Sequence, residues 1–525
     1  MSTSHEHRDE DAPVAARTSR RRLAALTTAA VVAAAGLLTA SLPAGGTPHR
    51  SETSQRYTAP DPASYTDQAA GLPAGLKKVI RRELDLTPAA YIAAADAARS
   101  ASAVVASLGG TVDDAWLDKD MTLHVTVADA DAAGTARAAG ARPEIGDPLA
   151  EQAAAKNAAR DGRTYWVDRA KGEVASYDSS SMDAMDMADG TLAGGYGWVF
   201  SVPGGKARCS LGFSGTGAFG QPVNFTAGHC VEQDIRASDI QLLDLDAPVS
   251  AGGTLKITNT FGTPGSGNIG LGDDGGILNI AGAYRTTPTV STWGGGQGSQ
   301  DDGDPVAVYD AAPVITGMPV CKSGATTGWT CGHVTVTETT ETIGDGSGGI
   351  AGQVTGFLFD ACILSGDSGG AILSGNYAVG VDSFGNMSTC ADAGKEDKLS
   401  GGFAVVSGTH NAETMFGDHF NLDISVGAPE IVGVKTVTGH SRHGSRAELT
   451  GTVAAATGAT VHVRVAHHRE LTATVEEGGT WSAELPRDLR PGRHTVTVTA
   501  SHRPEGSALT TTGKTTRATI TVPRI

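Results

Sequence analysis

The central motif of this sequence is the run Cys362-Ile363-Leu364-Ser365-Gly366-Asp367-Ser368-Gly369-Gly370. A serine hydroxyl is a poor nucleophile at neutral pH, so it needs a neighbouring base and backbone N–H donors that stabilise the oxyanion formed by its attack. Gly366 has no Cβ, so the backbone can turn its N–H and that of Ser368 toward one point. The same composition also suits an ordinary surface turn in a chain with 70 glycines. The run therefore indicates either a turn or a nucleophilic Ser368 with an oxyanion hole at Gly366 and Ser368.

Two motifs upstream of this run supply the partners that a nucleophilic serine needs. His229 lies in the run Asn224–Cys230, and histidine can accept and return a proton near pH 7. Asp274 could hold the imidazole in the required tautomer, and Asp273 beside it is the alternative. The chain order His, Asp, Ser is that of chymotrypsin-type enzymes and differs from the subtilisin and α/β-hydrolase orders. We therefore predict a catalytic triad of His229, Asp274 and Ser368.

The motifs around His229 and Ser368 resemble the two signatures of chymotrypsin-fold serine proteases. More narrowly, the chain is similar to the secreted bacterial streptogrisin and α-lytic protease group over roughly residues 190–425. Further stretches that carry this resemblance are Cys209–Phe213, Lys322–Gly328 and Val381–Ser383. The family usually has an aromatic or small apolar residue after the catalytic Asp and a basic residue further on. This chain has Gly275 and Asn279 there, which keeps Asp273 open as the alternative.

The resemblance implies a mainly β, multidomain protein whose residues 192–425 form a chymotrypsin-like double β-barrel. The short β-branched runs and Gly-rich turns of this region suit two antiparallel barrels with the triad at their junction. The implied activity is that of a serine endopeptidase, which hydrolyses protein or peptide substrates through an acyl-enzyme and uses no cofactor. The alternative from a different class is a secreted adhesion or binding protein with an inactive protease fold.

Substrate selection is predicted to involve the run Val381–Gly385, where Ser383 and Gly385 match the family strand that pairs with the substrate backbone. If Ser383 faces the triad, Asp382 should face the other way, because neighbouring side chains of a strand alternate. In this fold, that side holds the wall of the primary specificity pocket, and relatives usually carry an apolar residue there. A carboxylate would favour Lys or Arg in the substrate through a charge-assisted hydrogen bond. The alternative is that Asp382 has a structural partner and the pocket prefers large apolar side chains.

All six cysteines lie between residues 209 and 390. Six cysteines allow fifteen connectivities, and the sequence alone selects none of them. The family resemblance implies pairing of neighbours, which fits an oxidising, extracellular compartment. The implied disulfides are Cys209–Cys230, Cys321–Cys331 and Cys362–Cys390. A zinc site is the alternative, but Cys-x-x-Cys pairs are absent and His333 has no companion at ligand spacing, so we predict no metal.

The length and net charge of the chain limit its domain count and its partners, and its first residues point to export. A length of 525 residues fits about three domains. The formal net charge of −17 argues against a nucleic-acid partner, because phosphates would be repelled. Residues 1–46 read as a signal peptide, with Ser19–Arg22 ahead of the apolar stretch Leu23–Leu42, and 47–66 as a linker. A retained membrane anchor is the alternative, since the apolar stretch is nearly long enough to span a bilayer.

The pattern of apolar and capping residues in 67–180 differs from that of the later β-rich region and predicts a small α+β domain. Apolar residues recur at helical spacing near residue 80, Thr87-Pro88 reads as an N-cap followed by a first-turn proline, and strands are expected around 123–127 and 165–167. Three stretches resemble the pro-region of α-lytic-type proteases: Leu108–Asp118, Arg137–Ala141 and Tyr165–Asp168. The resemblance implies a folding assistant and inhibitor that is later removed, with cleavage in an exposed processing linker at 181–191.

Residues 426–525 show a third pattern, in which valines or isoleucines alternate with polar residues. The alternating positions are Val461, Val463, Val465, Val496, Val498, Ile520 and Val522. This period of two, interrupted by glycine-rich turns, predicts a β-sandwich similar to bacterial immunoglobulin-like domains. Such a module could bind a cell surface, a polymer or a substrate protein, or could act as a spacer, and the sequence leaves these open.

Overall fold

The computed structural model describes residues 56–146, 165–166, 190–202, 205–232, 240–345, 348–395, 397–438, 445–476, 479–503 and 510–524. All of them belong to one unit, Thr53–Ile525. The predicted signal peptide at 1–46 and nearly all of the predicted processing linker at 181–191 lie outside the described residues.

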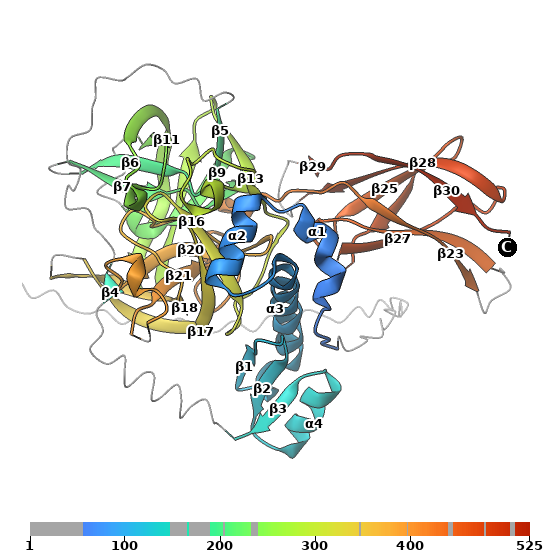
Figure 1. The fold of residues 1–525 in the computed structure, drawn as a ribbon, viewed down its shortest axis with the longest axis horizontal. Coiled ribbons are helices and arrows are strands. Elements are labelled where there is room, and N and C mark those ends of the chain that lie inside the picture. The colour runs from blue at the N-terminus through green and yellow to red at the C-terminus, as the bar shows by residue number, and fades with distance from the viewer. Residues whose placement is uncertain are drawn as a thin grey trace, which may run out of the picture. The chain divides into compact units, whose positions relative to one another are not determined.

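Helices dominate the described N-terminal part, as Figure 1 shows in blue. Thr87 caps the longest of them, because its side chain accepts a hydrogen bond from the Ala90 N–H at 3.1 Å and Pro88 occupies the first helical position. The helices are α1 (Thr66–Ala70), α2 (Ala74–Glu83), α3 (Pro88–Leu108) and α4 (Ala130–Ala138). The predicted helix near residue 80 is thus confirmed as α2, which buries Leu76, Val79 and Ile80. Among the described residues, no helix is both long and apolar enough to cross a membrane.

A small sheet completes this part, with strand order β1-β2-β3. Its strands are β1 (Asp114–Leu117), β2 (Leu123–Val127) and β3 (Arg142–Ile145). The predicted strand at 123–127 is confirmed as β2, and β3 runs parallel to it after helix α4. The strand expected around 165–167 also exists, as β4 (Tyr165–Trp166), but it pairs with strands β17 and β20 of the later β region instead of this sheet.

Two large sheets make up most of residues 197–422. The first has the order β22-β8-β9-β12-β11-β10-β6-β7. Its strands are β6 (Gly197–Val202), β7 (Gly205–Ser210), β8 (Phe213–Thr216), β9 (Pro222–Ala227), β10 (Ile240–Leu245), β11 (Leu255–Gly270), β12 (Asp273–Ile280) and β22 (Asn421–Leu422). The short turn η3 (Gly228–Cys230) directly follows β9 and carries His229. A smaller sheet has the strand order β14-β13-β5. Its strands are β5 (Thr191–Gly194), β13 (Arg285–Val290) and β14 (Val306–Ala307).

The second large sheet has the order β15-β20-β19-β16-β17-β18-β21, and a further pairing of β20 with β21 closes it into a barrel. Its strands are β15 (Asp310–Ala311), β16 (Pro319–Gly324), β17 (Gly328–Gly344), β18 (Ile350–Phe359), β19 (Ala371–Ser374), β20 (Tyr377–Gly385) and β21 (Ser400–Ala404). The Ser368 motif lies in the connection between β18 and β19. The chain passes from one large sheet to the other through Trp293, which is fully buried and donates from its indole N–H to the Ser323 hydroxyl at 3.1 Å.

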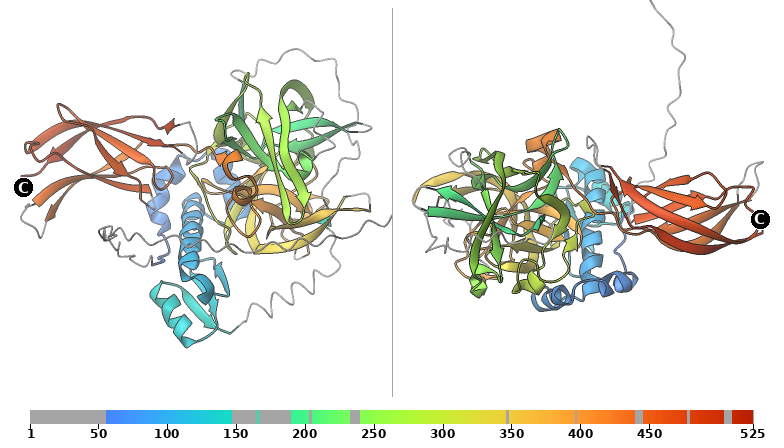
Figure 2. Two further views of the ribbon diagram at one scale, coloured as in Figure 1. Left: turned by 180° about the vertical axis from the view of Figure 1, so that it is seen from behind. Right: turned by 90° about the horizontal axis from the view of Figure 1, so that it is seen from above.

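Beyond residue 426 the chain forms two further sheets, which are drawn in orange and red in Figure 2. Buried side chains of the two sheets form one apolar core. The first sheet contains β23 (Glu430–Thr438), β24 (Ser445–Thr452) and β27 (Thr480–Glu484), and the second contains β25 (Thr460–Val465), β26 (Leu471–Thr474), β28 (Gly492–His502), β29 (Thr511–Thr512) and β30 (Thr516–Val522). The alternating valines predicted from the sequence point into this core, for example Val461 and Val463 of β25 and Val498 of β28.

Candidate active site

His229 and Asp274 lie together where two adjacent interior strands of the first large sheet meet the loops: His229 directly follows β9, and Asp274 is near the start of β12. Nδ1 of His229 is 3.0 Å from Oδ2 and 3.1 Å from Oδ1 of Asp274, and the His229 backbone N–H donates to Oδ1 at 2.8 Å. Both side chains are buried. The pairing of β9 with β12 brings them together, because Ala227 is opposite Gly275 in the register. One carboxylate therefore fixes both the backbone and the ring of the histidine.

Ser383 of strand β20 also contacts Asp274, since its hydroxyl donates to Oδ2 of the carboxylate. The rival carboxylate has a different partner: Asp273 Oδ1 lies 2.8 Å from Nδ1 of His410. Of the two neighbouring aspartates, the one that contacts His229 is Asp274. Ser383 thereby joins a strand of the second sheet to the histidine–aspartate pair of the first.

Ser368 is half-buried in a loop next to the histidine turn. Its carbonyl oxygen accepts a hydrogen bond from the Ser210 N–H at 2.8 Å and lies 3.9 Å from Sγ of Cys230, the neighbour of His229. Within the described residues, Nε2 of His229 has no hydrogen-bond partner, so the structure does not join it to the Ser368 hydroxyl. Nucleophile–base contacts are often loose without substrate and tighten when substrate binds.

Gly366 gives this loop a conformation that other residues rarely adopt, with φ of +92°. A Cβ at Gly366 would lie 2.4 Å from Nε of Arg208 and 2.6 Å from Oγ1 of Thr326. Its carbonyl oxygen is turned inward, where it accepts from the Ser210 hydroxyl at 2.9 Å. The N–H groups of Gly366 and Ser368 make no hydrogen bond to any other described residue. The loop thus leaves two backbone donors beside the serine available for an anionic oxygen.

A buried ion pair beneath this loop was not predicted from the sequence. Nζ of Lys322 is 3.2 Å from Oδ2 of Asp367, and both side chains are completely buried. The N–H groups of Thr326, Thr327 and Leu364 also donate to the Asp367 carboxylate, at 2.9 to 3.0 Å. These bonds hold the residue that precedes Ser368. Both residues belong to sequence motifs, but no local pattern indicates that strand β16 and the loop before β19 would bring them together.

Asp382, predicted to line the substrate pocket, is fully buried on β20. Neither of its carboxylate oxygens has a hydrogen-bond partner among the described residues. Burial and the nearby Asp367 charge raise the pKa of Asp382 well above its usual range, against the opposing effect of Lys322. Gly385, the other predicted pocket residue, pairs with Ser400 of β21 and with Trp166 of β4.

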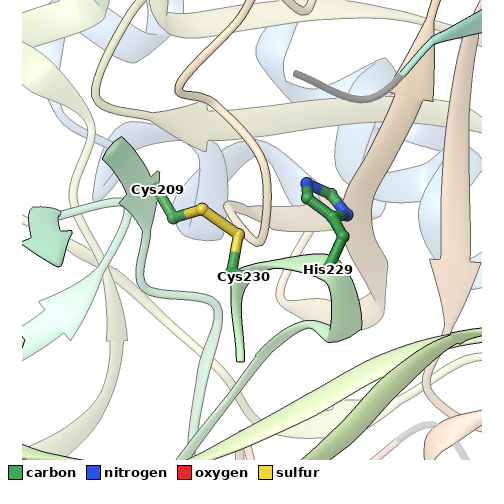
Figure 3. A group of neighbouring side chains, drawn as sticks. All are labelled: Cys209, His229 and Cys230. Carbon is green, nitrogen blue, oxygen red and sulfur yellow. A yellow bond between two sulfur atoms is a disulfide. The ribbon is translucent and has the colours of Figure 1, made fainter. Parts of the chain in front are cut away.

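The three disulfides are Cys209–Cys230, Cys321–Cys331 and Cys362–Cys390, the pairing that the family resemblance implied. Ligand atoms of Cys209, His229 and Cys230 lie within 4.8 Å of one another, a spacing that could suggest a metal site. Figure 3 shows, however, that the two sulfur atoms are bonded to each other beside His229. Disulfide sulfurs are not thiolates, so this group does not offer the donors that a metal ion needs.

Comparisons with known proteins match two families to successive parts of the chain. Residues 87–145 match the family described as "Alpha-lytic protease pro N-terminal", and residues 207–407 match the family "Trypsin". The chain is 31% identical to Serine protease 1 of Streptomyces fradiae over 66% of this chain and 88% of that protein. It is 27% identical to Streptogrisin-C of Streptomyces griseus, over 64% of this chain and 73% of the relative.

A third relative is Serine protease 1 of Rarobacter faecitabidus, which is 30% identical over 54% of this chain. The chain spans only about half of that protein, namely 52% of its length. The matches to the pro-region and to the protease region occur in the same order as the two regions described above. The chain therefore belongs to the trypsin-like serine endopeptidases of the streptogrisin type, with an α-lytic-type pro-region ahead of the protease region.

Proposed function

We propose that this protein is a secreted serine endopeptidase, made as a zymogen, that cleaves protein or peptide substrates through an acyl-enzyme. The observation that carries the proposal is the position of Asp274, whose carboxylate contacts both the ring and the backbone N–H of His229 and the hydroxyl of Ser383. A histidine held in this way presents Nε2 away from the carboxylate, as a general base requires. Ser368 lies in the adjacent loop, and its carbonyl oxygen is 3.9 Å from Sγ of Cys230, the neighbour of His229.

In the proposed reaction, Oγ of Ser368 attacks the carbonyl carbon of the scissile bond while Nε2 of His229 takes its proton. The oxyanion is stabilised by the N–H groups of Gly366 and Ser368. His229 then protonates the leaving amine, which leaves an ester on Ser368, and a water molecule activated by the same imidazole hydrolyses it. Asp274 keeps the ring in one tautomer and stabilises its protonated form throughout.

The proposed zymogen function is supported by strand β4 of the pro-region. Trp166 pairs antiparallel with Gly385 on β20, the strand predicted to bind the substrate backbone. The Tyr165 ring packs edge-on against Phe384, with centroids 5.4 Å apart. A segment added to this strand edge competes with a substrate that would bind there. The precursor should therefore be inhibited until β4 is removed.

Side chains of α2 and α3 accept hydrogen bonds from the protease region, which supports the pro-region as a partner of the protease. The Cys331 N–H donates to Glu83 at 2.7 Å, and the Gly375 N–H donates to the Tyr91 hydroxyl at 3.0 Å. A third bond joins the Tyr377 hydroxyl to the Asp96 carboxylate at 2.6 Å. Such contacts, made before the barrel is complete, would lower the folding barrier of a slowly forming β protein.

We also propose that residues 426–525 form an immunoglobulin-like domain that binds a cell-surface or polymer ligand. A groove of about 630 Å³ on this part of the chain supports a binding role. Its lining residues are Arg464, Val465, Ala466, Thr495, Thr497, Arg517, Ala518 and Thr519. Arginine and threonine side chains offer hydrogen-bond donors to an extended polar ligand.

N-terminal sequencing of secreted protein tests export, processing and activity together. We expect the active enzyme to begin between about residues 178 and 192. Cleavage before Gly190 would leave β5 paired with β13 and would keep the Gly190 carbonyl, which accepts a hydrogen bond from the Arg285 N–H at 2.9 Å. The Ser368→Ala precursor should remain uncut if processing is autocatalytic. An active enzyme that begins near residue 47 would refute the zymogen proposal.

A further inference from the structure

Two aspartates beneath the Ser368 loop differ sharply in their surroundings, although both are fully buried. Asp367 accepts hydrogen bonds from three backbone N–H groups and from the Thr327 hydroxyl, and it contacts the Lys322 ammonium. Asp382 receives no hydrogen bond on either oxygen from the described residues. A buried carboxylate without hydrogen bonds is costly, so structural need explains Asp367 but not Asp382.

The charges in this cluster do not balance. Lys322 is the buried cation beside the two carboxylates, and it is already engaged: its ammonium contacts Oδ2 of Asp367 at 3.2 Å, the Thr327 hydroxyl and the Gly328 carbonyl at 3.2 Å. One ammonium cannot neutralise two carboxylates. The second positive charge must therefore come from a proton on Asp382 or from a group outside the described chain.

The position of Asp382 ties its carboxylate to the nucleophile. Its carbonyl accepts from the Gly369 N–H at 2.7 Å, and its own N–H donates to the Gly370 carbonyl at 2.8 Å. A Cβ at Gly370 would lie 3.0 Å from Oδ2 of Asp382, so this oxygen is directed at the chain just after Ser368. The next residue, Ser383, turns instead to Asp274. The side chains of these two neighbours thus lie on opposite sides of β20, and the Asp382 carboxylate lies beside the backbone that follows Ser368.

We propose that Asp382 determines specificity by binding the cationic side chain of the substrate residue whose carbonyl Ser368 attacks, so that cleavage follows Arg or Lys. This inference rests on the proposed serine-endopeptidase function and names its substrate class. A guanidinium or ammonium group supplies the positive charge that the cluster lacks, together with the donors that both orphan oxygens need. Acidic side chains would be repelled, and apolar ones would leave the carboxylate unpaired.

The raised pKa of Asp382 fits this account. Without substrate, burial favours the neutral carboxylic acid, which avoids an unpaired buried charge. A cationic side chain that enters would favour the carboxylate, so the proton leaves to solvent as the ion pair forms. The competing explanation is that the proton stays, in which case Asp382 is a neutral part of an apolar pocket.

Peptides that differ only in charge at the residue before the scissile bond test the proposal. The processed wild-type enzyme is given matched fluorogenic peptides with Arg or citrulline, and with Lys or norleucine, at that residue. Citrulline and norleucine keep the approximate length of Arg and Lys but carry no charge. We expect kcat/KM to be roughly 10- to 100-fold higher for the charged member of each pair, the usual effect of a charge-assisted hydrogen bond. Equal rates within each pair would overturn the proposal, whether or not any variant folds.

Asp382→Asn should reduce the Arg-to-citrulline ratio of kcat/KM to near one. Asp423→Asn is the matched control: Asp423 is another poorly exposed carboxylate, bonded to Thr216 at 2.7 Å, and its loss should leave the ratio unchanged. An unchanged ratio in Asp382→Asn would also overturn the proposal. Titration with an organophosphonate counts active serines in every sample, so an enzyme that is labelled but lacks preference for Arg is distinguished from a protein with no reactive serine.

Discussion

Lys322 and Asp367 form a completely buried ion pair, with 3.2 Å between Nζ of the lysine and Oδ2 of the aspartate. The pair links strand β16 to the residue that immediately precedes Ser368. It therefore helps to set the position of the loop on which Ser368, the proposed nucleophile, and the proposed oxyanion donors lie.

Lys322→Met should destabilise the protease region by about 3–5 kcal/mol, because it leaves the Asp367 charge buried without its cation. Urea unfolding in a Ser368→Ala background, which prevents self-digestion, measures the change. Lys395→Met is the control, because Lys395 forms a surface ion pair with Asp392, with 2.7 Å between Nζ and Oδ1. The Lys395→Met variant should unfold like the parent. Similar unfolding of the two variants would show that the buried pair does not support the loop.

Asp274→Asn should lower kcat by roughly three to four decades, because the asparagine cannot hold His229 in the tautomer that accepts the serine proton. Asp273→Asn should retain nearly full activity, since Asp273 contacts His410 instead. Steady-state kinetics on one peptide, corrected for active enzyme, compares the two. The reverse pattern would mean that the wrong carboxylate has been assigned to the triad.

Gly366→Ala should abolish processing and activity. The φ of +92° disfavours any side chain, and the new Cβ would meet Arg208 Nε at 2.4 Å. Gly282→Ala adds a Cβ where no other atom lies within 4 Å, so this variant should be processed normally. Immunoblots for precursor and processed forms, with a peptidase assay, distinguish them. Normal activity of Gly366→Ala would exclude this loop as the oxyanion site.

The pH dependence of stability should reveal the raised pKa of Asp382. Its folded-state pKa is raised by burial, whereas an unfolded Asp has a pKa of about 3.9. The folded protein thus binds this proton more tightly than the unfolded chain does. The contribution of Asp382 to the free energy of unfolding is therefore greatest below about pH 4 and falls as the pH rises toward the raised pKa. In a Ser368→Ala background, the melting temperature of Asp382→Asn relative to the parent should increase from pH 4 to pH 7. A constant difference over this range would contradict the raised pKa.

The elements with a strong local signal could be predicted from the sequence. Thr87-Pro88 specified the start of α3, and the alternating valines of β25 and β28 specified inward-facing strands, because capping and side-chain periodicity depend on a few adjacent residues. The motifs around His229 and Ser368, with the order of the triad, were sufficient to identify the protease class. The disulfide pairing followed from the family resemblance, since spacing alone allows fifteen connectivities.

The remaining features depend on long-range pairing that no local pattern encodes. Tyr165 and Trp166 were recognised as a strand, but their pairing with β17 and β20 joins segments almost 180 and 220 residues apart. The choice between Asp274 and Asp273 also required the register of β9 against β12, because a one-residue slip would present the other carboxylate to His229. The Lys322–Asp367 pair was missed for the same reason.

Covalent labelling of Ser368 tests the central claim most directly. Processed wild-type protein is treated with a diphenyl phosphonate that carries a short peptide, and the modified residue is located by mass spectrometry after digestion. We predict one phosphonylated site, Ser368, with loss of peptidase activity in proportion to labelling and no labelling of Ser368→Ala or His229→Ala at the same dose. Absence of labelling on correctly processed wild-type protein would contradict the account and would favour a binding protein with an inactive protease fold.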